Sequence, residues 1–264
     1  MRESKPRGRA PVVAEADIRK QARALLAEHG PDAVSLRAIA RALGITAPAL
    51  YRYYDSREDL LAALRSECCD ELAAELSAQV AALPEGVSEA DGAAADGAAA
   101  DGSWGEGGGG DGLVQFFAIC RGFRRWALAN TQEFTLVFAS PGAVTGPVSQ
   151  RFTEPFGRIF LAAAGRLLTG YEITTPATDL IPPALREDLL DFRTELLAAL
   201  SESGQKFPAE KLDLGVTYLM IQSWARLYGH VTLEVFGNYP LPLSQPEVMF
   251  DAVLADLARS WGLT

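Results

Sequence analysis

The chain has 264 residues, of which 48% are hydrophobic and 22% charged, enough for a sizeable core in one large domain or two unequal ones. No apolar run approaches the roughly 18 residues of a membrane span, and the N-terminal stretch lacks the apolar segment of a secretory signal. We therefore expect a cytoplasmic protein with no membrane partner. The net charge of −10 is unevenly divided, because residues 1–57 hold eleven Lys and Arg against six Asp and Glu, while the remainder carries −15.

A basic segment joined to an acidic body indicates a head that faces nucleic acid, although basic ends are also often solvated tails. Residues 1–14 are expected to form a flexible basic arm. Its cations either reach a minor groove or phosphates of DNA or stay in solvent; they are Arg2, Lys5, Arg7 and Arg9.

The spacing of apolar residues predicts three helices in the region 15–60, which we assign as a DNA-binding domain. The first spans about 15–29 and ends at a glycine. Ser35 is the expected N-cap of the second, which Gly44 ends. Thr46 is the expected N-cap of a short third helix that runs to Tyr54.

Two short helices joined by a turn that contains glycine, here the residues ALGITA, are the signature of a helix-turn-helix. In that motif the second helix enters the major groove with its N-terminal residues at the base edges. Thr46 and Ala47 are small enough for this approach, and Thr46 can bond a base or contact a thymine methyl. Arg52 and Arg57 add the positive charge that phosphates attract. Tyrosines either contact phosphates or bases, as we favour for Tyr51 and Tyr53, or pack the head, as we expect for Tyr54.

A fourth helix is predicted from Ser56 to about Leu83, since an apolar residue recurs at every fourth position. It is long enough to join the head to a separate body. Cys68 and Cys69 lie on it, and Cys120 follows later. Three cysteines are too few for a disulfide framework, and the adjacent pair is either two small core residues or a redox switch.

Residues 84–112 hold seven acidic residues, no basic ones and a DGAAA repeat, so we expect a disordered loop. Its purpose stays open between an inert insertion and a brake that competes with DNA for the head. Beyond it, helices are predicted at about 113–129, 133–139, 150–168, 182–203, 208–236 and 246–261. The expected fold is therefore all-α, with a helix-turn-helix head and a larger domain, 61–264, for ligand binding and dimerisation.

The stretch from Arg19 to Leu64, centred on SLRAIARALGITAPALYRYYDSREDLLAAL, resembles the DNA-binding region of tetracycline-repressor (TetR/AcrR) family regulators. The resemblance implies that Arg37 and the residues Thr46, Ala47, Pro48 and Ala49 approach bases. It also implies that Tyr51, Tyr53 and Arg57 contact the DNA backbone. The position of Arg57 is most often Lys in the family, so the charge is kept.

The C-terminal half resembles more loosely a branch of the family with a Trp-x-x-x-His-Gly motif. The match is the segment Trp224–His230, in which Tyr228 replaces the usual His. Residues 123–138 are similar to the fifth and sixth helices of the family. The resemblance implies that the last two long helices pair with their copies in a dimer. An apolar stripe near the terminus independently supports an interface at Met249, Phe250, Val253, Leu257 and Trp261.

Control by a small molecule needs an apolar pocket with a few polar groups, in which case aromatic residues would line it; otherwise they form the core. The candidates are Phe116, Cys120, Phe123, Trp126, Phe134, Phe138, Phe156, Trp224 and Tyr228. The sequence predicts a homodimeric repressor that binds operator DNA and is released by a small apolar or amphipathic effector.

The alternatives are a non-specific architectural DNA-binding protein and an enzyme. The acidic body disfavours the first. No motif of a nucleotide-binding, hydrolase or metal site supports the second, and we expect no cofactor or metal. The effector, the operator and the choice between repressor and activator cannot be derived from the residues.

Overall fold

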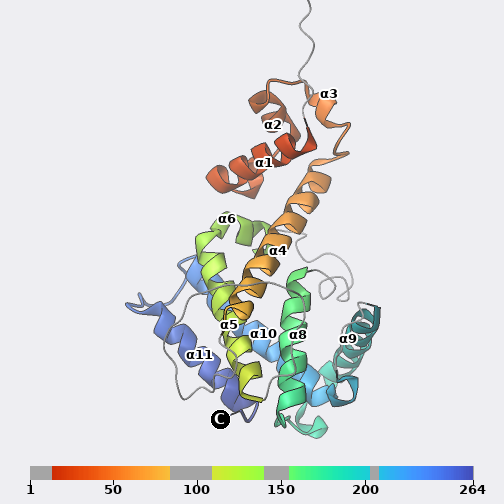
Figure 1. The fold of residues 1–264 in the computed structure, drawn as a ribbon, viewed down its shortest axis with the longest axis vertical. Coiled ribbons are helices and arrows are strands. Elements are labelled where there is room, and N and C mark those ends of the chain that lie inside the picture. The colour runs from red at the N-terminus through yellow and green to blue at the C-terminus, as the bar shows by residue number, and fades with distance from the viewer. Residues whose placement is uncertain (1–13, 84–108, 140–154, 203–207, 264) are drawn as a thin grey trace, which may run out of the picture. The chain divides into compact units, whose positions relative to one another are not determined.

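The structure, a computed structural model, describes residues 14–83, 109–139, 155–202 and 208–263 (Figure 1). These ranges contain helices and no strand, which confirms the all-α class. The chain divides into two compact units. Of the described residues, the first unit holds 14–68 and 130–139, and the second holds all the others. The predicted arm, apart from Ala14, and residues 84–108 of the predicted loop lie outside the described residues.

The first unit begins with the helices α1 (Glu15–His29), α2 (Leu36–Ala42) and α3 (Ala47–Leu50), with the short turn η1 (Pro31–Ala33) between α1 and α2. The first turns of α4 (Arg57–Ala81) complete this bundle (Figure 1). Their apolar faces meet in one core, whose centre includes the fully buried Ile18, Leu26, Ile39, Leu50 and Leu60. The predicted period of apolar residues thus placed the helices of the head correctly.

A distant part of the chain completes the first unit. Residues of α6 (Thr131–Phe134) contact α1, and the π-helical turn η3 (Thr135–Ala139) follows directly. Leu136 of this turn is fully buried in the core of the head, and its carbonyl oxygen accepts a 3.2 Å hydrogen bond from Nε of Arg65. The head is therefore built from two segments that are more than sixty residues apart in the sequence.

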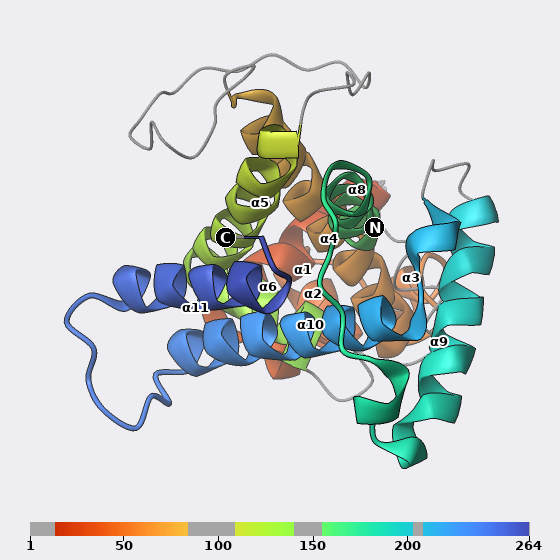
Figure 2. The same ribbon diagram turned by 90° about the horizontal axis from the view of Figure 1, so that it is seen from below.

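The second unit contains the rest of α4 and the helices α5 (Gly109–Ala129), α8 (Pro155–Gly170), α9 (Pro183–Glu202), α10 (Leu214–Val235) and α11 (Pro246–Ser260). Helix α5 packs along α8, and α10 contacts α5, α9 and α11 (Figure 2). Gly122 allows α4 to approach α5, because a Cβ there would lie only 2.6 Å from Cδ2 of Leu76. No described helix is long and apolar enough to cross a bilayer.

Several predicted boundaries need correction. Helix α3 ends at Leu50 instead of Tyr54, and the predicted loop ends before Gly109, where α5 begins. The segment predicted as one helix, 208–236, is a 3₁₀ turn, η5 (Ala209–Lys211), followed by α10. Helix α10 begins only after Asp213 because this residue is its N-cap: the carboxylate of Asp213 accepts a 2.7 Å hydrogen bond from the amide of Val216.

Candidate DNA-binding and effector sites

The turn between α2 and α3 has the geometry of a helix-turn-helix. Ser35 caps α2 as expected, since its Oγ accepts a 3.2 Å hydrogen bond from the amide of Ala38. Gly44 then adopts φ +67°, a left-handed conformation that side chains disfavour, and the amide of Ile45 bonds the carbonyl of Ala40 at 3.0 Å. This sharp turn sets the start of α3 next to the end of α2.

The short helix α3 is held by its apolar residues and presents its polar ones. Leu50 is fully buried, and Ala47 packs against the head core. Around them most of the predicted DNA-contact side chains are exposed to solvent; these are Arg37, Thr46, Pro48, Tyr51, Arg52 and Tyr53, while Ala49 is half-buried. The structure thus brings these predicted contacts together on the α2–α3 corner of one small bundle.

Thr46 does not act as the predicted side-chain cap of α3. Its hydroxyl makes no capping hydrogen bond, and the residue is exposed at the N-terminal end of the helix. The helix is closed instead by backbone bonds, from the amides of Ala49 to Thr46 at 2.9 Å and of Tyr53 to Leu50 at 2.9 Å. The Thr46 side chain is therefore available for a ligand of the helix end.

Tyr54 packs the head, as predicted, and is 4% exposed. Its hydroxyl donates to a carboxylate oxygen of Glu15 at 3.2 Å and accepts from Arg19 at 3.4 Å. Nε of Arg19 also lies 2.5 Å from Glu67 of α4. Burial raises the pKa of the Tyr54 phenol above its ordinary value. This network ties α1 to α4 and to Tyr54, which follows α3.

Arg57 is placed differently from the exposed arginines. Its Nε donates to the carbonyl oxygen of Val34 at 2.7 Å, and its Nη2 donates to that of Pro31 at 2.7 Å. These bonds lie within the head and join the first turn of α4 to the residues just before α2.

In the second unit, five aromatic rings from α5, α8 and α10 form a cluster. Trp224 lies near the middle, with its ring centroid 5.9 Å from those of Phe123 and Phe160 and 6.1 Å from that of Phe156. Tyr228 stacks on it at 5.7 Å with the ring planes 19° apart. Phe123 is fully buried, whereas Trp224 is 36% exposed. The cluster therefore combines a packed interior with an accessible indole.

Only part of the predicted ligand-binding set belongs to this cluster. Phe123, Phe156, Trp224 and Tyr228 are members, whereas Phe134 and Phe138 lie in the first unit with ring centroids 5.3 Å apart. Cys120 and Trp126 are buried in the second unit. The sequence reasoning missed Phe160, which lies one helical turn after Phe156, a spacing that would have found it.

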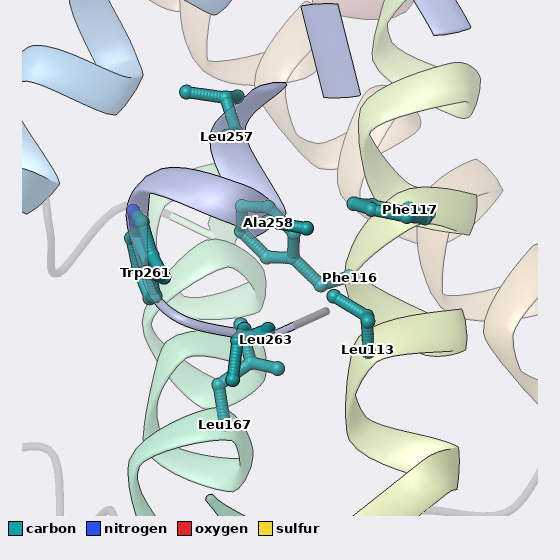
Figure 3. Close-up of a pocket in the computed structure, with 8 residues that line it drawn as sticks. All are labelled: Leu113, Phe116, Phe117, Leu167, Leu257, Ala258, Trp261 and Leu263. Carbon is teal, nitrogen blue, oxygen red and sulfur yellow. The ribbon is translucent and has the colours of Figure 1, made fainter. Parts of the chain in front are cut away.

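A small apolar pocket lies elsewhere in the second unit (Figure 3). Phe116 and Phe117 of α5, Leu167 of α8 and the end of α11 around Trp261 line it, and it is partly open to solvent. Its cavity volume of about 10 Å³ is room for about one water molecule and lies far below the roughly 300–1,000 Å³ of pockets for drug-sized ligands. Of the predicted ligand-binding residues, Phe116 alone lines it among those described.

A partly buried polar group joins α5 to α10 and to the segment before α11. Arg124 forms a two-point ion pair with Glu234, with an Nε–Oε2 distance of 2.7 Å, and its pKa is raised by this carboxylate. His230, 7% exposed, lies 3.9 Å from Glu234 and bonds the hydroxyl of Tyr239. Burial is the main cause that lowers the pKa of His230 below its ordinary value. The group holds together helices that also carry the ring cluster.

Comparison with known proteins gives a consistent result. The family model described as bacterial regulatory proteins of the tetR family matches residues 18–64, and that of the tetracyclin repressor-like C-terminal domain matches residues 116–257. The chain belongs to the TetR family. It is 31% identical to the HTH-type transcriptional regulators Mb1846 of Mycobacterium bovis and Rv1816 of Mycobacterium tuberculosis, over 90% of this chain and 88% of each relative. It is therefore a TetR-family transcriptional regulator with a DNA-binding helix-turn-helix.

A solved structure supports the fold of the TetR-family chain. The crystal structure of the regulatory protein SCO4313 aligns with a TM-score of 0.54, covering 92% of this chain and 93% of that one, at 22% sequence identity. At this identity the likeness concerns the fold alone.

The apolar stripe near the C-terminus, which we expected at the dimer interface, packs largely against the chain's own core. Phe250, Leu257 and Trp261 are buried, and Nε1 of Trp261 donates to Oγ of Ser223 at 2.9 Å. Of the five predicted interface residues, Met249 is exposed and Val253 half-buried. Other exposed apolar residues, which the sequence reasoning missed, lie on α10, at its C-cap and on α11; they are Ile221, Leu233, Phe236 and Val248.

Proposed function

We propose that this regulator is a homodimeric repressor that holds a palindromic operator and releases it when a small apolar or amphipathic effector binds its second unit. The observation that carries the proposal is the surface around α3. The buried Leu50 anchors a helix of four residues, and the side chains predicted to contact bases and phosphates are exposed beside it. Tyr51 and Tyr53 are 51% and 42% exposed beside this helix, so their hydroxyl groups can reach a bound DNA backbone.

The contacts divide by chemistry. Thr46, Pro48 and the half-buried pair Ala47 and Ala49 offer the helix end to base edges. Arg37 approaches base edges beside them, Arg52 neutralises phosphates, and Tyr51 and Tyr53 donate hydroxyl hydrogen bonds to phosphate oxygens. The arm cations Arg2, Lys5, Arg7 and Arg9 add phosphate or minor-groove contacts beside the major groove. A protein that binds DNA acts where the DNA is, so we place it in the cytoplasm.

Two heads on one palindrome require a dimer with two-fold symmetry. The exposed apolar residues of α10 and α11 are the best-supported surface, because Ile221, Phe236, Val248 and Met249 are all at least 39% exposed. Apolar side chains in such number on adjacent helices are typical of an interface. This assignment replaces Phe250, Leu257 and Trp261, which pack inside their own chain.

The effector site that we favour is the ring cluster around Trp224. It supplies aromatic surface from three helices, and its central indole remains partly accessible. A coupling of about 1–3 kcal/mol between this site and the head lowers DNA affinity 5- to 150-fold.

The test is fluorescence anisotropy of labelled duplexes. A duplex selected from a random-sequence pool by the wild-type protein is titrated at two salt concentrations beside a scrambled duplex. We expect selective binding by a dimer, weakened when arginine or tyrosine is removed at Arg52 or Tyr51. Equal affinity for both duplexes contradicts sequence-selective regulation.

The effector half of the proposal is tested separately. Small apolar compounds are screened for quenching of Trp224 fluorescence, with Trp224→Phe as the control variant. Compounds that quench are added to the protein–DNA complex, and release of the selected duplex is expected. Binding that leaves DNA affinity unchanged contradicts the effector model.

A further inference from the structure

Arg57 forms a two-point clamp inside the head. The guanidinium reaches back from the first turn of α4, and two of its nitrogens, Nε and Nη2, each donate to a backbone carbonyl at 2.7 Å. The acceptors belong to Pro31, the first residue of η1, and to Val34, which follows η1 and directly precedes the N-cap Ser35. A planar fork is suited to such a pair of acceptors, and a lysine ammonium is not.

Oxygen atoms of the head already surround the positive charge of Arg57. Nη1 lies 3.9 Å from a carboxylate oxygen of Glu58, and Nη2 lies 4.0 Å from one of Asp32. A DNA phosphate at this guanidinium would meet two carbonyl oxygens and two carboxylates, all of which repel it. Arg52 is exposed and forms no ion pair with any described residue, so a phosphate there meets no such conflict.

The position of the clamp matters because the helices it supports are short. Helix α2 has seven residues and α3 has four, and helices of this length do not hold their place without tertiary contacts. The clamp fixes the chain where α2 begins, and α2 passes this placement to α3 through the Ile45–Ala40 backbone bond and the shared core of Ile39 and Leu50. Hydrogen bonds to base edges tolerate only small displacements.

We propose that Arg57 is a positioning residue that sets α2 and α3 for sequence-selective DNA recognition, and that it is not a phosphate contact. This inference rests on the proposed function for its DNA readout. It departs from the role that the family resemblance implies for this position. It also explains why a residue with a forked side chain stands where a point charge would be enough for a phosphate.

The test compares Arg57→Lys and Arg57→Met with Arg52→Lys and Arg52→Met, on the duplex selected by the wild-type protein and on a scrambled duplex. We expect both Arg57 variants to lose about tenfold or more in affinity for the selected duplex, the effect of about one impaired base contact, while binding to the scrambled duplex and its salt slope stay at wild-type values. Arg52→Met should instead reduce the salt slope by about one for both duplexes, and Arg52→Lys should not.

Two DNA results overturn the proposal. One is Arg57→Lys with wild-type selectivity and Arg57→Met with a reduced salt slope, which is the behaviour of a phosphate contact. The other is unchanged selectivity of both folded Arg57 variants with only a lower melting temperature, which is the behaviour of a residue that serves stability alone.

Hydrogen exchange of the free protein tests the clamp without DNA. We expect the amides of residues 36–45 to exchange faster in Arg57→Lys than in the wild type, and those of α10 to be unchanged. Unchanged exchange in 36–45 contradicts the proposal. If selection yields no preferred duplex, the proposed function fails while this measurement still decides the role of Arg57.

Discussion

The two units of the chain carry their candidate functional residues in opposite ways. In the head, the DNA-contact side chains stand outside a regular apolar core, so Leu50 packs while Tyr51 and Arg52 face solvent. In the second unit, the candidate ligand residues are themselves part of the core, since Phe123 is fully buried and Phe156 is 8% exposed. The proposed DNA contacts are therefore separate from the core of the head, whereas the proposed ligand residues are part of the core of the second unit.

The largest expected effect comes from truncation of the ring cluster. Phe123→Ala removes a fully buried ring that touches three others, and we expect a loss of about 3–5 kcal/mol in the free energy of unfolding. The matched change in the head, Tyr51→Ala, should stay within about 0.5 kcal/mol while weakening DNA binding. Denaturant titrations measure both. A loss below about 1 kcal/mol for Phe123→Ala would indicate a site that already tolerates a cavity, and the contrast would fail.

A second truncation tests whether the segment 130–139 belongs energetically to the head. Leu136→Ala should cost about 2–5 kcal/mol, since the side chain is fully buried among residues of the head. Leu128→Ala, at a position that is 37% exposed in α5, serves as the control and should have a much smaller effect. Hydrogen exchange of α1 and α2 locates the loss. If Leu136→Ala leaves their protection unchanged, the segment is only an attachment to the head.

Ser35 and Thr46 precede α2 and α3, and substitution of each by alanine distinguishes an effect on stability from an effect on DNA recognition. Ser35→Ala removes an observed cap and should lower the free energy of unfolding by about 1 kcal/mol. Thr46→Ala removes no cap bond, so stability should stay within about 0.5 kcal/mol while selectivity for the operator falls. Thermal unfolding and anisotropy on selected and scrambled duplexes give the two readouts. An equal loss of stability in both variants would contradict the assignment.

The smallest expected effect is on the pH dependence of stability. His230 has a folded pKa below its ordinary value of 6.5, so the unfolded chain binds more protons as the pH falls through that value. The contribution of this group to stability is thus complete above pH 6.5 and is lost below it. His230→Gln should flatten the fall in unfolding free energy between pH 7 and pH 5, measured by denaturant titration, relative to the wild type. An unchanged profile would show that other groups dominate.

The sequence predicted the head almost completely because its signals are local. The cap at Ser35, the turn at Gly44 and the spacing from Ile18 to Leu60 all act within a few residues. Two details of the head were wrong: α3 ends at Leu50, at a point that no residue type marks, and the Thr46 hydroxyl makes no capping bond. The inclusion of residues 130–139 was beyond reach, because long-range packing of Leu136 leaves no local pattern and a π-helical turn has no apolar period of its own.

In the second unit the same patterns were harder to interpret. An apolar stripe at helical spacing, such as Phe250, Leu257 and Trp261, predicts a buried face but does not distinguish the chain's own core from a partner. The aromatic residues showed the same ambiguity, and only the structure separated the cluster around Trp224 from Phe134 and Phe138. Which helices meet is decided by packing over distances that single-sequence patterns do not report.

The two-segment construction of the head limits how the protein can be taken apart. A fragment that stops after Cys68 keeps every residue of the helix-turn-helix yet lacks Leu136, and with it the side chain that closes the core and the acceptor for Arg65. We therefore expect that the helix-turn-helix does not fold stably when it is moved alone. A chimera that carries this DNA specificity into another regulator must include residues 130–139 together with residues 14–68, or the core of its head will be incomplete.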